Sequence, residues 1–207
     1  ITMLVVSVDS VPHSYEELVD AIKRVPAFAA SFLITVMFWL GHYRWSRRYG
    51  IEDTGSVVLS LLLVFLVLVF LYPLRLMMSG ALHAMSGGWL PGEIEITRFS
   101  HLQFFFVLYG VAFMLMSGVL LALYARVRRM HLDPPLSAEG RAAAGVEVQA
   151  WGILASMGAI STLLTLLLPP RHIGYAVWIY ASLAVIMPVM ARRWERAVQR
   201  AVVAEAR

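Results

Sequence analysis

Apolar residues run in five long stretches along the chain, and short segments rich in charged residues, glycine and proline separate them. A helix needs about 20 apolar residues to cross a hydrocarbon core of about 30 Å. The stretches therefore predict five membrane-spanning helices, at residues 26–46, 56–79, 101–127, 149–168 and 172–192. A polar cytoplasmic helix is expected to follow at 193–207, on the anionic inner leaflet of the membrane.

The N-terminal residues 1–8 are also apolar, but a helix of this length would be only about 12 Å long at 1.5 Å per residue. We interpret them as the second half of a first helix whose opening turns precede the sequence. The expected fold is an all-α membrane protein with six transmembrane helices per subunit, in a single transmembrane domain covering residues 1–207.

Two of the connections carry local signals. Ser14 and Glu17 form the pattern of a capping box, which predicts a short helix that runs into the first complete span with a kink at Pro26. Residues 80–100 are expected to form a long outer loop. Trp45 and Trp89 lie near span ends, where tryptophan commonly anchors a helix at the membrane interface.

Composition agrees with the pattern, since 60% of the residues are hydrophobic and 14% are charged. Of the 17 basic residues, twelve fall in the connections after residues 46 and 127, at the ends of their spans and in the C-terminal tail, and five fall on the opposite side. Cytoplasmic segments of membrane proteins are enriched in Lys and Arg. This distribution predicts a multi-pass protein of the cell membrane with both termini in the cytoplasm, so the net charge of +4 is no sign of nucleic-acid binding.

Little in the sequence points to an enzyme or a cofactor. The chain has no cysteine, which excludes disulfides, thiolate metal sites and a cysteine nucleophile. Ionisable residues are nearly absent from the span interiors, where proton-coupled transporters carry their relays. His42 and His101 fall near opposite faces of the membrane, which disfavours haem. We expect no enzymatic activity, no catalytic or metal-binding residues, and no cofactor.

Two motifs resemble a known family. The segment 31–44 reads SFLITVMFWLGHYR, and its Ser-Phe-Leu followed by Trp-x-x-His at Trp39 and His42 resembles the second helix of the lysosomal potassium channel family. Residues 1–5 read ITMLV, with Val-Pro shortly after, and resemble the second half of that family's first helix. Leu-Tyr-Gly at 108–110 is similar to its fourth helix. Ser60 stands where the third helix of the family usually has Asn.

The resemblance implies a potassium-permeable channel built as a homotetramer in the lipid bilayer. In this family the first helix lines the pore, and apolar side chains form its constriction beside a threonine ring. Carried onto this chain, the pore-lining residues would be Thr2, Met3 and Val6. Trp39, His42 and Ser60 would form an interhelical polar network away from the ions, and monovalent cations, K⁺ above all, would be the permeant species rather than a cofactor.

Two alternatives follow from the same sequence. A six-helix membrane protein could serve as a non-conducting scaffold for a partner, or it could transport a small solute. Interrupted apolar segments, the usual sign of a transporter site, are missing from the five stretches.

Overall fold

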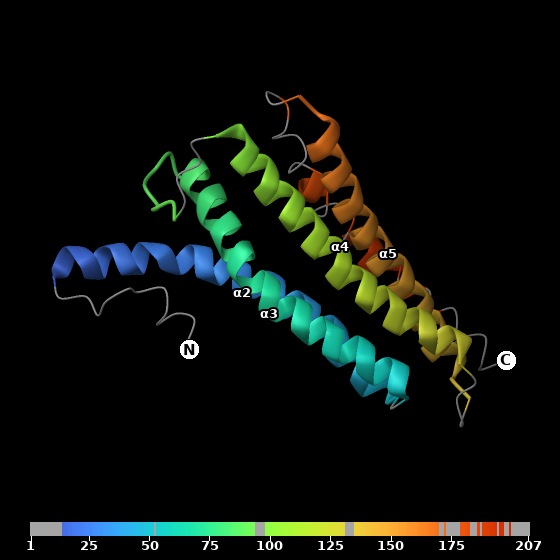
Figure 1. The fold of residues 1–207 in the computed structure, drawn as a ribbon. Helices are drawn as coiled ribbons and strands as arrows, with labels where there is room; N and C mark the ends of the chain where they lie inside the picture. The colour runs from blue at the N-terminus through green and yellow to red at the C-terminus, as the bar shows by residue number, and fades with distance from the viewer. Residues whose placement is uncertain are drawn as a thin grey trace.

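The computed structural model describes residues 14–51, 53–93, 98–130 and 135–169, together with residues 172, 179–182, 186, 188–193, 195, 196 and 199. Four long helices dominate these residues: α2 (Tyr15–Tyr49), α3 (Thr54–Met85), α4 (Phe99–Arg129) and α5 (Ala138–Leu167). A short 3₁₀ helix, η2 (Ile179–Ser182), follows. Each of the four long helices is apolar and long enough to span a membrane. This confirms the prediction of an all-α protein with several helices that can cross a membrane (Figure 1).

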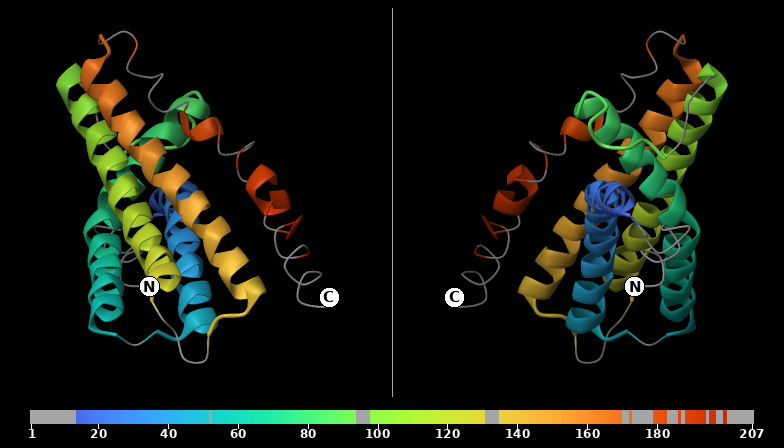
Figure 2. Two further views of the ribbon diagram at one scale, coloured as in Figure 1. Left: turned by 90° about the vertical axis from the view of Figure 1, so that its right-hand side faces the viewer. Right: turned by 90° about the vertical axis from the view of Figure 1, so that its left-hand side faces the viewer.

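Six helices per subunit stay a prediction. Residues 1–8 lie outside the described residues, as do ten residues of the predicted span at 172–192 and most of the predicted helix at 193–207. Within that part of the chain, η2 and an α-helical run at 188–193 are described, and Figure 2 shows both to one side of α5.

The helices extend beyond the apolar stretches that predicted them. α2 begins at the predicted capping residue, because the Ser14 hydroxyl accepts a hydrogen bond from the Glu17 N–H at 3.1 Å. It continues through Pro26 as one helix of 35 residues. α5 begins eleven residues before the predicted start at 149, with Ser137 capping the Gly140 N–H at 3.0 Å. Hydropathy predicts only the apolar part of a helix. The backbone hydrogen bonds of the same helix continue into the neighbouring polar residues, so the helices are longer than the apolar stretches.

The prediction of an outer loop at 80–100 was wrong for residues 80–85, because α3 continues to Met85. α3 also changes direction in its second half (Figure 1), as expected for a helix that contains Pro73. After α3 the chain folds back along its last turns. There Arg75 pairs with Glu93, and the Ser79 hydroxyl accepts a hydrogen bond from the Glu93 N–H at 3.0 Å.

α4 and α5 make the most extensive contact between helices. The contact depends on two glycines that let the backbones approach each other. A Cβ atom on Gly158 would lie 2.6 Å from the Met114 backbone nitrogen, and one on Gly110 would lie 3.1 Å from the Gly158 carbonyl oxygen. Small residues serve this purpose at helix crossings in membranes, where packing replaces the hydrophobic effect.

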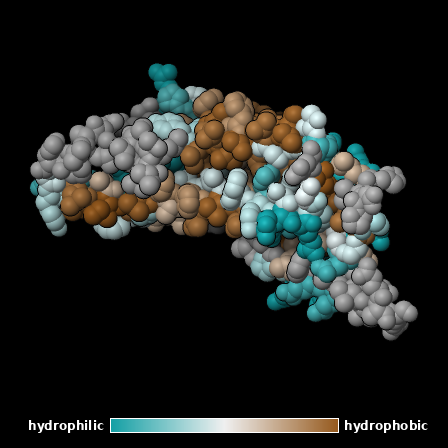
Figure 3. Space-filling view, turned by 90° about the horizontal axis from the view of Figure 1, so that it is seen from below, coloured by the Kyte–Doolittle hydropathy of each residue, from teal (hydrophilic) through white to brown (hydrophobic). Residues whose placement is uncertain are grey.

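The rest of the apolar surface is not covered by the chain itself. In α2 and α3 only 22% of the most hydrophobic window is buried, compared with 39% in α4. Phe32, Leu33, Leu61 and Phe65 are all more than half exposed. Figure 3 shows hydrophobic side chains over much of one face and hydrophilic ones gathered mostly toward its right-hand end. A surface of this kind requires lipid or further protein against it.

Candidate functional site

The second half of α2 contacts each of the other three long helices, and it carries two of the predicted network residues. His42 on α2 and Ser60 on α3 lie within hydrogen-bonding distance, with 2.9 Å between the imidazole Nε2 and the hydroxyl oxygen. The ring of Trp39 stacks on His42 with centroids 5.8 Å apart. Trp39 is 56% exposed, so its ring shields the hydrogen bond from one side and faces outward on the other.

Trp45 shows that interface anchoring was the wrong interpretation for this residue. Its side chain is 3% exposed, and the indole Nε1–H donates a hydrogen bond to the Leu123 carbonyl of α4 at 3.1 Å. In the opposite direction, the Tyr124 hydroxyl of α4 donates to the Gly41 carbonyl of α2 at 3.0 Å. These reciprocal bonds use backbone carbonyls that already accept helical hydrogen bonds, and they fix α2 against α4 in one register. Trp89, by contrast, is 69% exposed, and the Lys23 ammonium lies 6.0 Å from its ring centroid.

Gly41 is needed at this crossing for steric reasons. A Cβ atom there would lie 2.4 Å from the Trp151 ring of α5 and 3.1 Å from the Leu120 side chain of α4. Phe38, one turn earlier on α2, is fully buried and packs edge-on against Phe113 of α4. The backbone of α2 therefore lies directly against the aromatic core of α4 and α5.

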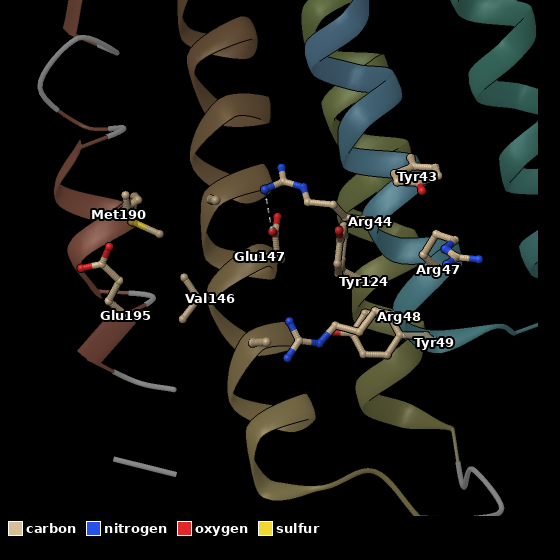
Figure 4. Close-up of a pocket in the computed structure, with 13 residues that line it drawn as sticks. Tyr43, Arg44, Arg47, Arg48, Tyr49, Tyr124, Val146, Glu147, Met190 and Glu195 are labelled. Atoms are coloured by element: carbon tan, nitrogen blue, oxygen red, sulfur yellow. Dashed lines mark ion pairs between the residues drawn. The ribbon is translucent and has the colours of Figure 1, made fainter. Parts of the chain in front are cut away.

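Charged groups of several helices meet where α2 and α4 end and α3 and α5 begin, and we call this the arginine-rich end. Arg44 of α2 reaches Glu147 of α5, with 3.7 Å between the nitrogen and the carboxylate oxygen (Figure 4). Glu147 also accepts a hydrogen bond from the Trp151 indole at 3.0 Å. One turn further along α2, Arg48 pairs with Glu139 at 2.5 Å.

These ion pairs border a cavity of about 690 Å³ between α2, α5 and the C-terminal segment. Figure 4 shows Arg44 and Arg48 extending toward α5 across the cavity, while Met190 and Glu195 face it from the other side. Two of its three arginines, Arg44 and Arg48, are paired with carboxylates, and the Glu195 side chain adds a further negative charge to the lining.

Asp53, in the connection between α2 and α3, completes the arginine-rich end. It caps α3 by accepting hydrogen bonds from the Ser56 hydroxyl at 2.5 Å and the Gly55 N–H at 3.0 Å, and it pairs with Arg126 of α4. The Ser56 hydrogen bond, and then those from Gly55 and Arg126, lower the pKa of the Asp53 carboxyl below its ordinary value. Asp53 thus joins the start of α3 to the end of α4 through its ionised form.

The structure brings together three of the six predicted site residues. Trp39, His42 and Ser60 form one contiguous group on α2 and α3. Thr2, Met3 and Val6 lie outside the described residues. Within the described part of the chain, no group of three His, Asp or Glu side chains is arranged to hold a metal ion.

Sequence reasoning missed the contacts of Trp45, Tyr124 and Glu147. The partners of Trp45 and Tyr124 lie 78 and 83 residues away in the sequence. Glu147 gave a weak signal, as an isolated carboxylate shortly before an apolar stretch, and Ser137 gave a clearer one as a helix cap.

Comparison with known proteins shows two sequence similarities. A sequence model of the endosomal/lysosomal potassium channel TMEM175 family matches residues 1–73, the part that contains α2 and most of α3. A protein named "Potassium channel" from Marivirga tractuosa is 29% identical over 135 residues, covering 63% of this chain and 54% of that protein. The N-terminal part of the chain is therefore similar to this channel family.

A solved structure agrees at the level of the fold. The crystal structure of the potassium channel MtTMEM175, as a threonine-to-alanine variant in complex with a nanobody–MBP fusion, superposes with a TM-score of 0.77 at 23% sequence identity. The match covers 94% of this chain and 87% of that one. The chain spans about half the length of the curated relative it matches, at 54%. The four long apolar helices and the similarity of residues 1–73 to this family both support a membrane location.

Proposed function

We propose that the chain is the subunit of a potassium-permeable cation channel, active as a homotetramer with the first helix of each subunit around the pore. The match of the TMEM175 family model to residues 1–73 is the observation that carries the proposal. The name of the Marivirga tractuosa relative supports the permeant ion. The uncovered apolar faces of α2 and α3 support assembly, because they leave room for contact with another subunit as well as with lipid.

Thr2, Met3 and Val6 are the proposed pore-lining residues. Thr2 and Val6 are four apart and share one face of a helix. A ring of threonine hydroxyls can replace part of the hydration shell of a cation, and rings of apolar side chains can gate a pore by dewetting. In this arrangement the hydroxyl ring favours K⁺, and the apolar rings restrict the flow.

The group of Trp39, His42 and Ser60 has a positioning role in this proposal. The hydrogen bond between His42 and Ser60 ties α2 to α3, and Trp45 ties α2 to α4. A helix fixed in this way offers a rigid wall against which a first helix can pack. No ion needs to touch any of these side chains.

The test is cation flux into proteoliposomes by the parent and two variants. Thr2→Val keeps the shape of the side chain and removes the hydroxyl, so we expect a reduced preference for K⁺ over Na⁺. Val6→Thr makes the apolar stretch easier to wet, so we expect a larger flux. The matched control is Thr35→Val on α2, because the Thr35 hydroxyl donates to the Ser31 carbonyl of its own helix and should have no part in conduction.

Each outcome distinguishes among the candidate functions. If the parent conducts and neither Thr2→Val nor Val6→Thr changes flux or selectivity, another helix lines the pore. A parent without cation flux would favour a non-conducting scaffold or a solute transporter.

We further propose that the arginine-rich end and both termini face the cytoplasm, within a single membrane domain over residues 1–207. The absence of native cysteine allows single-cysteine labelling in intact cells. A membrane-impermeant thiol reagent should modify Met85→Cys, where the native side chain is 82% exposed at the end of α3. It should spare Arg47→Cys and Arg196→Cys. The reverse pattern would invert the orientation.

A further inference from the structure

The arginines of the arginine-rich end fall into two groups. The first group is paired with carboxylates: Arg44 with Glu147, Arg48 with Glu139, and Arg126 with Asp53. The second group has no carboxylate partner among the described residues, and three of its members, Arg128, Arg129 and Arg141, line one hollow of about 430 Å³.

This hollow lies between the last turn of α4 and the first turn of α5. Arg128 and Arg129 come from α4, and Arg141 comes from α5. The connecting segment between the helices has one carboxylate in the sequence, Asp133, which lies outside the described residues. Three guanidinium groups therefore exceed the carboxylates available from this segment, and the hollow keeps an excess of positive charge.

The remaining walls of the hollow are apolar. They consist of Val127, Met130, Pro135 and Leu136. Val127 is 1% exposed and belongs to the core of the bundle. The hollow thus combines cationic groups with an apolar wall at the end of two membrane-spanning helices. A ligand that fits both parts has an anionic head and an apolar body.

The larger cavity of about 690 Å³ is a poorer site for an anion, although it also contains arginines. Arg44 and Arg48 are each engaged by a glutamate there, and Glu195 adds a further negative charge. An anion that binds Arg44 or Arg48 must displace a carboxylate from its partner, which leaves Arg47 as the one arginine of that lining without a carboxylate partner among the described residues. At Arg128, Arg129 and Arg141 no described carboxylate has to be displaced.

We propose that Arg128, Arg129 and Arg141 bind the phosphate of an anionic phospholipid headgroup, with the lipid's apolar part against Pro135 and Leu136. The planar guanidinium fork matches phosphate oxygens in bidentate geometry, which an ammonium group cannot do. Basic pockets between transmembrane helices are suited to lipid headgroups. The N-terminus of α5 adds the positive end of its helix dipole beside Arg141.

The experiment compares lipid binding by the full chain and two triple variants, using native mass spectrometry with added phosphatidylglycerol or phosphatidylcholine. Substitution of Arg128, Arg129 and Arg141 by Gln should lower the apparent affinity for phosphatidylglycerol about 100-fold, at roughly fivefold per arginine. Phosphatidylcholine binding should not change. The control replaces Arg47, Arg192 and Arg193 by Gln, which removes the same net charge from exposed side chains that lie outside this hollow.

An equal loss of affinity in both triple variants would overturn the site and leave only general surface attraction. Competition by inorganic phosphate at the concentration that saturates phosphatidylglycerol would also overturn the lipid assignment, because a soluble anion would then be the ligand. Should the Gln variant fail to fold, a second variant replaces Arg128, Arg129 and Arg141 by Lys. It keeps the three positive charges and removes the planar guanidinium groups. It should bind phosphatidylglycerol more weakly than the parent, and an unchanged affinity would contradict the proposal.

Discussion

The crossing of α4 and α5 makes Gly158→Ala the most direct test of the packing. An added Cβ atom would meet backbone atoms on α4, at 2.6 Å from the Met114 nitrogen and 2.8 Å from the Gly110 carbonyl oxygen. Real Cβ atoms do not approach other atoms this closely. Backbone atoms inside a helix cannot rotate away as a side chain can. The substitution must therefore move α4 and α5 apart along part of their contact.

The magnitude follows from two opposing terms. Overpacking of a tight interior site costs about 1–3 kcal/mol. Replacing a helical glycine by alanine gains about 1 kcal/mol in helix propensity. Gly118→Ala supplies a matched control on α4, because a Cβ atom there meets nothing within 4 Å. The difference in unfolding free energy between the two variants isolates the steric term, about 1–3 kcal/mol, because both share the propensity gain.

The assay is thermal unfolding of detergent-purified protein, followed by the intrinsic fluorescence of its six tryptophans. A chain of this size loses about 2–4 °C in Tm for each kcal/mol, so Gly158→Ala should melt about 2–12 °C below Gly118→Ala. Gly110→Ala offers a second check, since its Cβ would lie 2.4 Å from the Thr162 hydroxyl oxygen. Adding Thr162→Ala to Gly110→Ala should raise the Tm of that variant part of the way back to the parent value. Adding Thr162→Ala to Gly158→Ala should not raise its Tm, because the Gly158 Cβ meets backbone atoms of α4. Equal melting temperatures for Gly158→Ala and Gly118→Ala would refute the reasoning.

Three further predictions concern the polar contacts between helices. Tyr124→Phe removes a buried hydrogen bond to the Gly41 carbonyl and should lower the free energy of unfolding by about 1 kcal/mol, measured by the same thermal assay. Asp53→Asn should be less stable than the parent near neutral pH. Because the folded pKa of Asp53 lies below its ordinary value of 3.8, this difference should shrink as the pH falls through that lowered pKa; a pH-independent difference would contradict the pairing. His42→Ala, which leaves Ser60 without its partner, should lower thermostability while the cation permeability ratio of the folded protein stays unchanged. A changed ratio at unchanged stability would place His42 in the ion path.

The sequence determined those features that depend on local chemistry. Long apolar stretches predicted four of the helices, because a backbone in lipid must satisfy its own hydrogen bonds. Ser14 predicted the start of α2, since a cap acts on N–H groups within three residues. The basic residues predicted that the end of α2, the end of α4 and the start of α5 share one side, and the pairs Arg48–Glu139 and Arg126–Asp53 agree with this arrangement.

Tertiary structure decided which of these helices touch and through which atoms. Trp45 looked like an interface anchor because hydropathy cannot distinguish a tryptophan facing lipid from one facing a carbonyl on another helix. Its partner, Leu123, lies 78 residues away. Gly158 and Gly118 are indistinguishable as glycines in apolar helices, yet the structure places backbone against one and nothing against the other. Apolar side chains match lipid and protein equally well, so the choice between them depends on the close packing of helix surfaces, which exists only once the helices are assembled.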